Sequence, residues 1–151
     1  MRAVVQRVTR AEVAIAGETV GAVGPGFMVL VCAMRGDTEA EADLMAAKIA
    51  KLRVFRDAEG RMNLAIGDIG GSVLAISQFT LAADTSRGNR PGFSTAAEPE
   101  TGARLYDRLC AALRDLGIAV QTGRFGAEMA VSLINDGPVT IMLDTETWRK
   151  A

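Results

Sequence analysis

The sequence contains no histidine and only two cysteines among its 151 residues. Histidine is the side chain most often used to transfer protons near neutral pH, so any catalysis must come from hydroxyls, amides, backbone groups or the substrate. A Ser-His-Asp triad is excluded. Cys32 and Cys110 form no paired-cysteine motif, which disfavours a zinc site. We therefore expect no metal, no cofactor and two reduced, buried thiols.

Long apolar runs and a strong net charge are also absent. A membrane span needs about 20 apolar residues, and neither such a run nor a signal peptide is found. We therefore predict a cytoplasmic protein that does not enter membranes. The net charge of −1 gives no general attraction for nucleic acid. Arginine supplies 14 of the 17 basic residues and suits phosphate groups, but codon usage in a GC-rich genome would give the same bias.

Familiar nucleotide-binding and esterase motifs are missing as well. The chain has no GxxxxGK(S/T) loop, no GxGxxG after a strand and no GxSxG elbow. Carboxylates are plentiful, yet no pair stands out as a general acid and a general base. The sequence therefore does not predict an enzyme that depends on a nucleotide or on a Ser-His-Asp triad.

Hydrophobic periodicity predicts about eight strands and two helices. Thr38 and Glu41 form a capping-box pattern before the first helix, and Pro99 opens the second. The expected strands are residues 3–9, 11–16, 19–23, 27–33, 73–78, 118–121, 130–134 and 139–143. The apolar face of the second helix comprises Leu105, Leu109, Leu113 and Leu116. These elements predict an α+β fold, with mixed, largely antiparallel sheets curled like a barrel and backed by two main helices.

Two uncharged or weakly charged segments stand out at strand ends. Ser77–Leu81 (SQFTL) follows a buried strand, where binding and catalytic groups are often found, although its polar side chains could instead satisfy nearby backbone groups. Asn135–Thr140 (NDGPVT) separates two apolar runs. Its Asp-Gly-Pro core is typical of a turn, so the pattern alone predicts a hairpin there.

Both segments resemble motifs of the D-aminoacyl-tRNA deacylases. SQFTL is similar to that family's SQxTL motif, and NDGPVT is similar to its NxGPxT motif. Further agreement is found in residues 2–8, 55–57, 70–74 and 122–125. The resemblance runs from Met1 to about Asp144 and implies a single deacylase domain at residues 1–145. Residues 146–151 lie outside the resemblance, and their sequence predicts a loose tail.

The resemblance implies a homodimer that hydrolyses the ester between a D-amino acid and the terminal adenosine of tRNA. Glycyl-tRNA is an expected further substrate, and L-aminoacyl-tRNA is rejected by a cis Gly-Pro motif supplied across the dimer. The residues implied in the reaction are Ser77, Gln78, Phe79 and Thr80. The residues implied in substrate binding are Arg7, Phe125, Met129, Gly137 and Pro138.

The missing histidine is compatible with this reaction because aminoacyl esters are labile. Losing a general base costs about 10²–10⁴ in rate, whereas one backbone oxyanion donor contributes about 10²–10³. We expect backbone N–H groups near Gln78 and Phe79 to stabilise the oxyanion, and Thr80 to position groups rather than to act as a nucleophile.

Contact with tRNA is expected to rest on three loop arginines, Arg87, Arg90 and Arg124, which could equally be solvated surface charges. Two other functions stay open at this point. One is a non-catalytic dimeric module that binds RNA or amino acids, and the other is a small hydrolase that acts on free esters.

Overall fold

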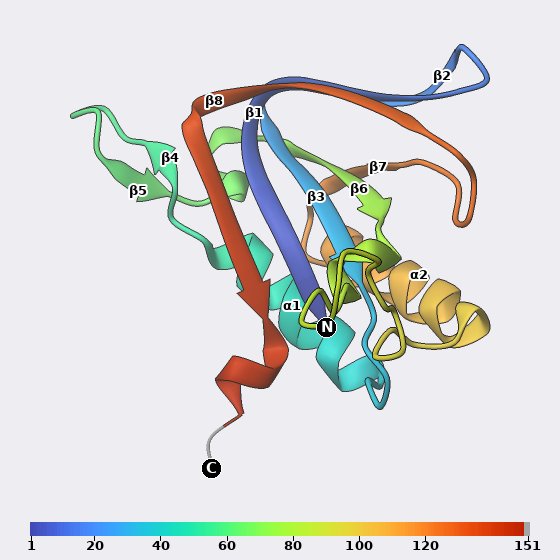
Figure 1. Ribbon diagram of the computed structural model, residues 1–151. Coiled ribbons are helices and arrows are strands. Elements are labelled where there is room, and N and C mark those ends of the chain that lie inside the picture. The colour runs from blue at the N-terminus through green and yellow to red at the C-terminus, as the bar shows by residue number, and fades with distance from the viewer. Residues whose placement is uncertain (150–151) are drawn as a thin grey trace.

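A six-stranded mixed sheet forms the centre of the computed structural model, which describes residues 1–149 (Figure 1). The strands are β1 (Arg2–Ile15), β2 (Glu18–Val23), β3 (Gly26–Cys32), β4 (Phe55–Arg56), β5 (Met62–Leu64), β6 (Ser72–Ser77), β7 (Ala119–Thr122) and β8 (Ala130–Asp144). The α-helices are α1 (Glu39–Lys51) and α2 (Pro99–Asp115), and the 3-10 helices are η1 (Ile66–Ile69), η2 (Phe79–Ala82) and η3 (Thr145–Trp148).

The long strand β1 organises the sheet. It pairs antiparallel with β3 through its first half, with β2 through its second half and with β8 along its other edge. Beyond β3, the strands β6 and β7 add in parallel. β2 and β7 meet so closely that a Cβ atom at Gly21 would lie 2.7 Å from the carbonyl oxygen of Thr122. The predicted fold class is confirmed: the mixed sheet is nearly closed into a barrel, and two helices cover it (Figure 1).

Two hydrophobic clusters hold these layers together. The larger cluster lies between the sheet and the helices, where Leu105, Leu109 and Leu113 are fully buried. The smaller cluster fills the inside of the curled sheet, with Val13 and Leu74 at its centre. Leu116 was expected on the buried face of α2 but is 55% exposed, because it stands at the C-cap beyond the last packed turn.

Several predicted boundaries change in the structure. The two strands expected at residues 3–9 and 11–16 form the single strand β1. Its pairing with β8 shifts register between Gln6 and Arg10, but β8 pairs with β1 both before and after this point and keeps the strand continuous. A small sheet of β4 and β5 was not predicted, although the turn between them was. The capping box at Thr38 and Glu41 is confirmed, and its hydrogen bonds lower the pKa of Glu41 to about 2. Within residues 1–149, no helix is both long and apolar enough to cross a membrane.

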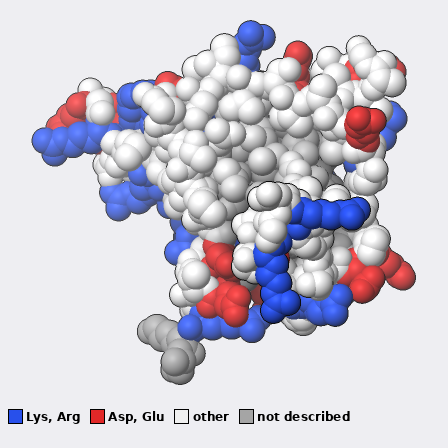
Figure 2. All heavy atoms as spheres, viewed as in Figure 1, with Lys and Arg blue, Asp and Glu red and all other residues white. Residues whose placement is uncertain are grey.

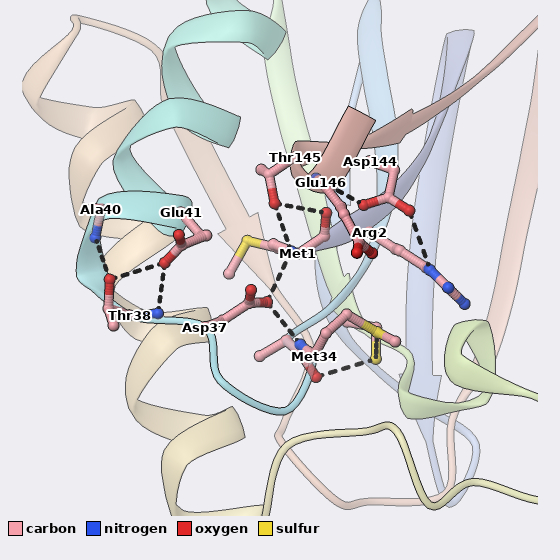
Figure 3. Close-up of polar contacts among 12 residues, drawn as sticks. Met1, Arg2, Met34, Asp37, Thr38, Ala40, Glu41, Asp144, Thr145 and Glu146 are labelled. Atoms are coloured by element: carbon pink, nitrogen blue, oxygen red, sulfur yellow. Dashed lines mark hydrogen bonds and ion pairs between the residues drawn. The ribbon is translucent and has the colours of Figure 1, made fainter. Parts of the chain in front are cut away.

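The start and the end of the described chain meet beside α1 (Figure 3). The ammonium group of Met1 is fully buried, 2.7 Å from Asp37 Oδ2 and 2.7 Å from Thr145 Oγ1. The loose tail expected from residue 146 is wrong up to residue 149: Trp148 packs against the larger core cluster, and Arg149 Nη2 lies 2.6 Å from Glu41 Oε1. Residues 150–151 lie outside the described part.

Candidate active site

A cavity of about 610 Å³ opens where β6 ends. Its walls come from the ends of β3 and β6, the start of α2 and the loops before α2 and after β7. The residues that line it include Cys32, Arg35, Ser77, Gln78, Phe79, Phe93, Ala97, Tyr106, Phe125 and Met129. The cavity is within the range of small-molecule sites, which are mostly apolar with a few polar groups.

The predicted segment Ser77–Leu81 forms one wall of this cavity. β6 ends at Ser77 because the chain turns into η2, and the amide of Gln78 makes the last sheet-like bond, 2.8 Å from the carbonyl oxygen of Val31. Ser77, Gln78 and Phe79 line the cavity, whereas Thr80 is exposed next to them and accepts a hydrogen bond from Gln78 Nε2.

The backbone donors of this wall differ from one another. The amide of Gln78 was expected to help stabilise an oxyanion, but it already donates to Val31 and is not available. The amides of Phe79 and Thr80 open η2, where an N–H group has no acceptor within its own helix. Of the amides around Gln78 and Phe79, those of Phe79 and Thr80 are therefore the candidates for the expected oxyanion donor.

Two weakly acidic side chains at the cavity stay protonated. Tyr106 donates to the carbonyl oxygen of Ala75 at 2.6 Å, and burial raises its pKa well above the usual value. Burial also raises the pKa of the Cys32 thiol, which lies 3.6 Å from the carbonyl oxygen of Phe79. Tyr106 thus ties α2 to β6, and both cysteines are buried free thiols, as expected from the sequence.

Phe125 and Met129 both lie at the cavity, as expected for residues around a substrate pocket. The Phe125 ring is 41% exposed, and its centroid lies 6.4 Å from that of Tyr106. An aromatic face at the rim of an apolar cavity is a suitable surface on which a planar ring can stack.

The segment Asn135–Thr140 is not a hairpin, so that prediction is wrong. It lies inside the continuous strand β8, where Asn135 pairs opposite Val8 and Thr140 pairs opposite Gln6. Residues 136–139 therefore bulge out of the sheet opposite Arg7. The Asn135 side chain closes the bulge, since it accepts from the amide of Val139 at 3.1 Å and donates to Thr140 Oγ1 at 3.0 Å.

Arg7 supports the bulge from the neighbouring strand β1. Its side chain is only 3% exposed, and it donates to the carbonyl oxygens of Val54 at 2.6 Å and Asp136 at 3.0 Å. The Gly137–Pro138 bond is cis, and Gly137 has a φ of +133°, which residues other than glycine rarely adopt. A Cβ atom at Gly137 would lie 2.9 Å from Arg7 Nη2. The role expected for Arg7 as a support for this segment agrees with these contacts.

Within one chain, the two segments lie apart. The pairing places Ser77 level with Ala3 of β1, whereas the bulge faces Arg7, four residues or roughly 13 Å further along. β8 and β6 are also separated by β1 and β3. Gly137 and Pro138 are exposed and do not line the cavity of their own chain.

The three arginines expected to contact tRNA are all exposed. Arg87 and Arg90 lie on a loop that is closed by paired backbone bonds between Asp84 and Gly92, at 2.7 and 2.9 Å. Basic side chains gather over the connection between η2 and α2 (Figure 2). The sequence analysis missed Arg35, which lines the cavity mouth, is 67% exposed and pairs with Glu98 at 3.6 Å.

The described residues offer little to hold a metal ion. Within residues 1–149, no three or more Cys, Asp or Glu side chains gather closely enough to form a metal site. Apart from the exposed Arg35–Glu98 pair and the Cys32 thiol, the polar groups that line the cavity are hydroxyls, amides and backbone atoms, which can bind and orient an ester.

Comparison with known proteins decides the family. The sequence model described as D-Tyr-tRNA(Tyr) deacylase matches residues 4–144. The chain belongs to this deacylase family. A D-aminoacyl-tRNA deacylase of Dinoroseobacter shibae is 62% identical over 144 residues, which cover 95% of this chain and 99% of that protein. The deacylase of Lacticaseibacillus casei is 60% identical, over 97% of this chain and 99% of its own.

Solved structures share the deacylase fold. One described as a c-Myc DNA unwinding element binding protein has a TM-score of 0.90 at 40% identity, covering 95% of this chain and 98% of its own. Another, described as a probable eukaryotic D-amino acid tRNA deacylase, has a TM-score of 0.79 at 19% identity, covering 94% and 97%. The second likeness concerns the fold alone.

Proposed function

We propose that this chain is a cytoplasmic hydrolase that cleaves the ester between a D-amino acid and the terminal adenosine of tRNA. The observation that carries the proposal is the cavity at the end of β6, lined by Ser77, Gln78 and Phe79, in a chain of the deacylase family. The cavity is large enough for a small molecule, and the exposed side chain of Arg35 is part of its lining, where the phosphates of an acceptor end can approach.

The chemistry needs no ionisable protein group. The amide of Phe79 or Thr80 stabilises the oxyanion that forms on the ester carbonyl, and the ribose 2′-hydroxyl beside the ester helps to activate water. Thr80 accepts a hydrogen bond from Gln78 and holds that side chain in place. Nothing next to Thr80 would deprotonate it, so it positions groups and forms no acyl-enzyme.

The second part of the proposal is that a homodimer completes the site. Pro138, Thr140 and Met142 are all exposed, so this side of β8 faces outward from the bulge onward. Met142 is 83% exposed, the highest value among the large apolar side chains of residues 1–149, and Phe79 at the cavity is 59% exposed, so packing against a partner would remove apolar surface from water. A second copy packed on this face would receive the Gly137–Pro138 bulge at its own cavity.

Stereochemical selection follows from exclusion. Discriminating 10⁴-fold against the L form requires about 5.5 kcal/mol, which a clash supplies more readily than an added attraction. The bulge backbone would block an L side chain, and its carbonyl groups would hold the substrate ammonium. Glycyl-tRNA has no side chain to block and should therefore also be cleaved.

Contact with the tRNA phosphates is assigned to Arg87, Arg90 and Arg124, all exposed on loops. Binding should weaken as salt concentration rises, since each phosphate contact releases counterions. Binding that does not respond to salt would contradict this assignment.

The deciding experiment compares the release of tyrosine from D-tyrosyl-tRNA and L-tyrosyl-tRNA. We expect the D ester alone to be cleaved. A binding module would cleave neither ester, and a general esterase would also cleave D-tyrosine esters that lack the tRNA. Either result would overturn the proposed function.

A further inference from the structure

A second arginine, Arg56, holds the bulge, and the sequence analysis gave it no role. Its guanidinium meets the carboxylate of Asp136 with two contacts, Nη1 to Oδ2 at 3.1 Å and Nη2 to Oδ1 at 3.4 Å. Asp136 directly precedes Gly137. A fork of this kind constrains the orientation of the carboxylate as well as its position.

The short segment Val54–Arg56 supports the bulge in two ways, directly through Arg56 and indirectly through Arg7. The carbonyl oxygen of Val54 accepts from Arg7, which itself donates to the carbonyl oxygen of Asp136. Phe55, between them, is only 6% exposed, and its ring centroid lies 4.9 Å from that of Phe27. The segment is therefore anchored in the core and braces both the backbone and the side chain of Asp136.

The small sheet gives Arg56 a defined place. β4 is short, but the turn after it is closed by Asp57, whose Oδ1 accepts from the amides of Glu59 at 2.9 Å and Arg61 at 3.0 Å. β4 and β5 lie together at one side of the main sheet (Figure 1). The sheet thereby presents Arg56 to a carboxylate 80 residues further along the chain.

We propose that Arg56 is a positioning residue that sets the orientation of Gly137 and Pro138, and that it thereby contributes to the rejection of L substrates. Arg7 holds the Asp136 backbone and also lies 3.5 Å from one carboxylate oxygen, and Arg56 adds the fork that prevents the bulge from turning about that point. This inference rests on the proposed function, because the bulge must act on a substrate for its orientation to affect selection.

The test measures kcat/KM for D-tyrosyl-tRNA and L-tyrosyl-tRNA in four variants: Arg56→Ala, Arg56→Lys, Asp136→Asn and the control Arg61→Ala. Arg61 lies on the same hairpin, and its side chain is 80% exposed and pairs with Glu59 at 3.9 Å, so its truncation to alanine keeps the backbone bonds to Asp57 and should leave the D/L ratio unchanged. Arg56→Ala and Asp136→Asn should each lower the ratio about fivefold through faster L hydrolysis. Arg56→Lys should lower it less, since an ammonium keeps the charge but not the fork.

Salt provides a readout that a general loss of stability would not move. The Arg56–Asp136 pair is partly exposed, so high salt should lower the D/L ratio of the wild type more than that of Arg56→Ala, in which Asp136 keeps only its contact with the buried Arg7. Because both substrates carry the same tRNA, the phosphate contacts cancel in the ratio.

Each outcome decides between the two proposals. A wild type that cleaves the D ester selectively while Arg56→Ala and Asp136→Asn keep its ratio would overturn the role of Arg56 alone. A wild type without selectivity would overturn the proposed function. Equal loss in Arg61→Ala would show that the hairpin acts through stability rather than through the ion pair.

Discussion

The segments Ser77–Leu81 and Asn135–Thr140 carry similar small polar residues, yet the fold builds them in opposite ways. The first segment ends a strand, continues as a 3-10 helix and lines a cavity of its own chain. The second bulges from the middle of a continuous strand and faces solvent. The first therefore lines a cavity of its own chain, whereas the second lines none within its own chain.

The supports of the two segments differ in the same sense. Ser77–Leu81 is held mainly by backbone bonds, including the one to Val31, with a single charged contact from Arg2 to the carbonyl oxygen of Leu81 at 3.1 Å. Asn135–Thr140 is held by charged side chains from distant parts of the chain, Arg7 and Arg56, and by its own Asn135. A surface bulge with this much support is a rigid projection, and rigidity is what selection by clash requires.

The largest expected effect comes from removing the buried support. Arg7→Ala should lower the free energy of unfolding by about 2–4 kcal/mol, because it empties a buried site and leaves two carbonyl oxygens without a donor. Urea denaturation measures this loss. Arg10→Ala, at an exposed position of the same strand, should change stability by about 0.5 kcal/mol or less. Similar losses in the two variants would contradict the role of Arg7.

The outward face of β8 should be the next most sensitive. Met142→Glu places a charge on the most exposed apolar side chain and should weaken dimerisation about 100-fold. Analytical ultracentrifugation gives the dissociation constant. Ser132→Glu, exposed on the same strand but before the bulge, is the matched control. Equal dimerisation of both variants and the wild type would remove this face from the interface.

A smaller effect is expected in the first segment. Thr80→Ala removes one hydrogen bond to Gln78 and should lower kcat/KM for D-tyrosyl-tRNA about tenfold, without abolishing it. Rapid quench of the reaction should reveal no acyl-enzyme in either protein. A covalent intermediate present in the wild type and lost in Thr80→Ala would make Thr80 a nucleophile.

The smallest effect depends on pH. The Arg56 hydrogen bonds lower the pKa of Asp136 below its ordinary value of 3.8. A carboxylate whose pKa is lower in the folded state stabilises the protein at pH values above its unfolded-state pKa. This contribution disappears as the pH falls through the folded-state pKa. The free energy of unfolding of the wild type should therefore exceed that of Asp136→Asn by about 0.5–1 kcal/mol near neutral pH. This difference should disappear as the pH falls below the ordinary pKa of an aspartate. A gap that stays constant into acid would contradict the ion pair.

The sequence predicts the elements that rest on local chemistry. The capping box at Thr38 and the helical spacing of Leu105, Leu109 and Leu113 are local patterns, and the structure confirms them. The strand before Ser77 was also predicted, and with it the place of the cavity wall. Local spacing and local hydrogen bonds are visible in one stretch of chain, so these predictions needed no tertiary information.

The wrong predictions concern features that distant strands decide. Asp136-Gly137-Pro138 has the pattern of a turn, but β1 pairs with β8 on both sides of it and keeps the strand continuous. The prediction of a loose tail is wrong for residues 146–149, because Trp148 packs against the core cluster that includes residues of α1. Arg35 and Arg56 were missed because each pairs with a partner 63 or 80 residues away, which no local motif marks.

Mixed dimers test the central claim most directly. Ala97→Trp fills the cavity, and Gly137→Ala disturbs the bulge, because its Cβ atom would lie 2.9 Å from Arg7. Each variant alone should fail to cleave D-tyrosyl-tRNA selectively. After random subunit exchange, half of the dimers are mixed and each has one complete site, so about a quarter of the selective wild-type activity should return. Mixed dimers that form but show no activity beyond that of the two parents would contradict a site shared between subunits.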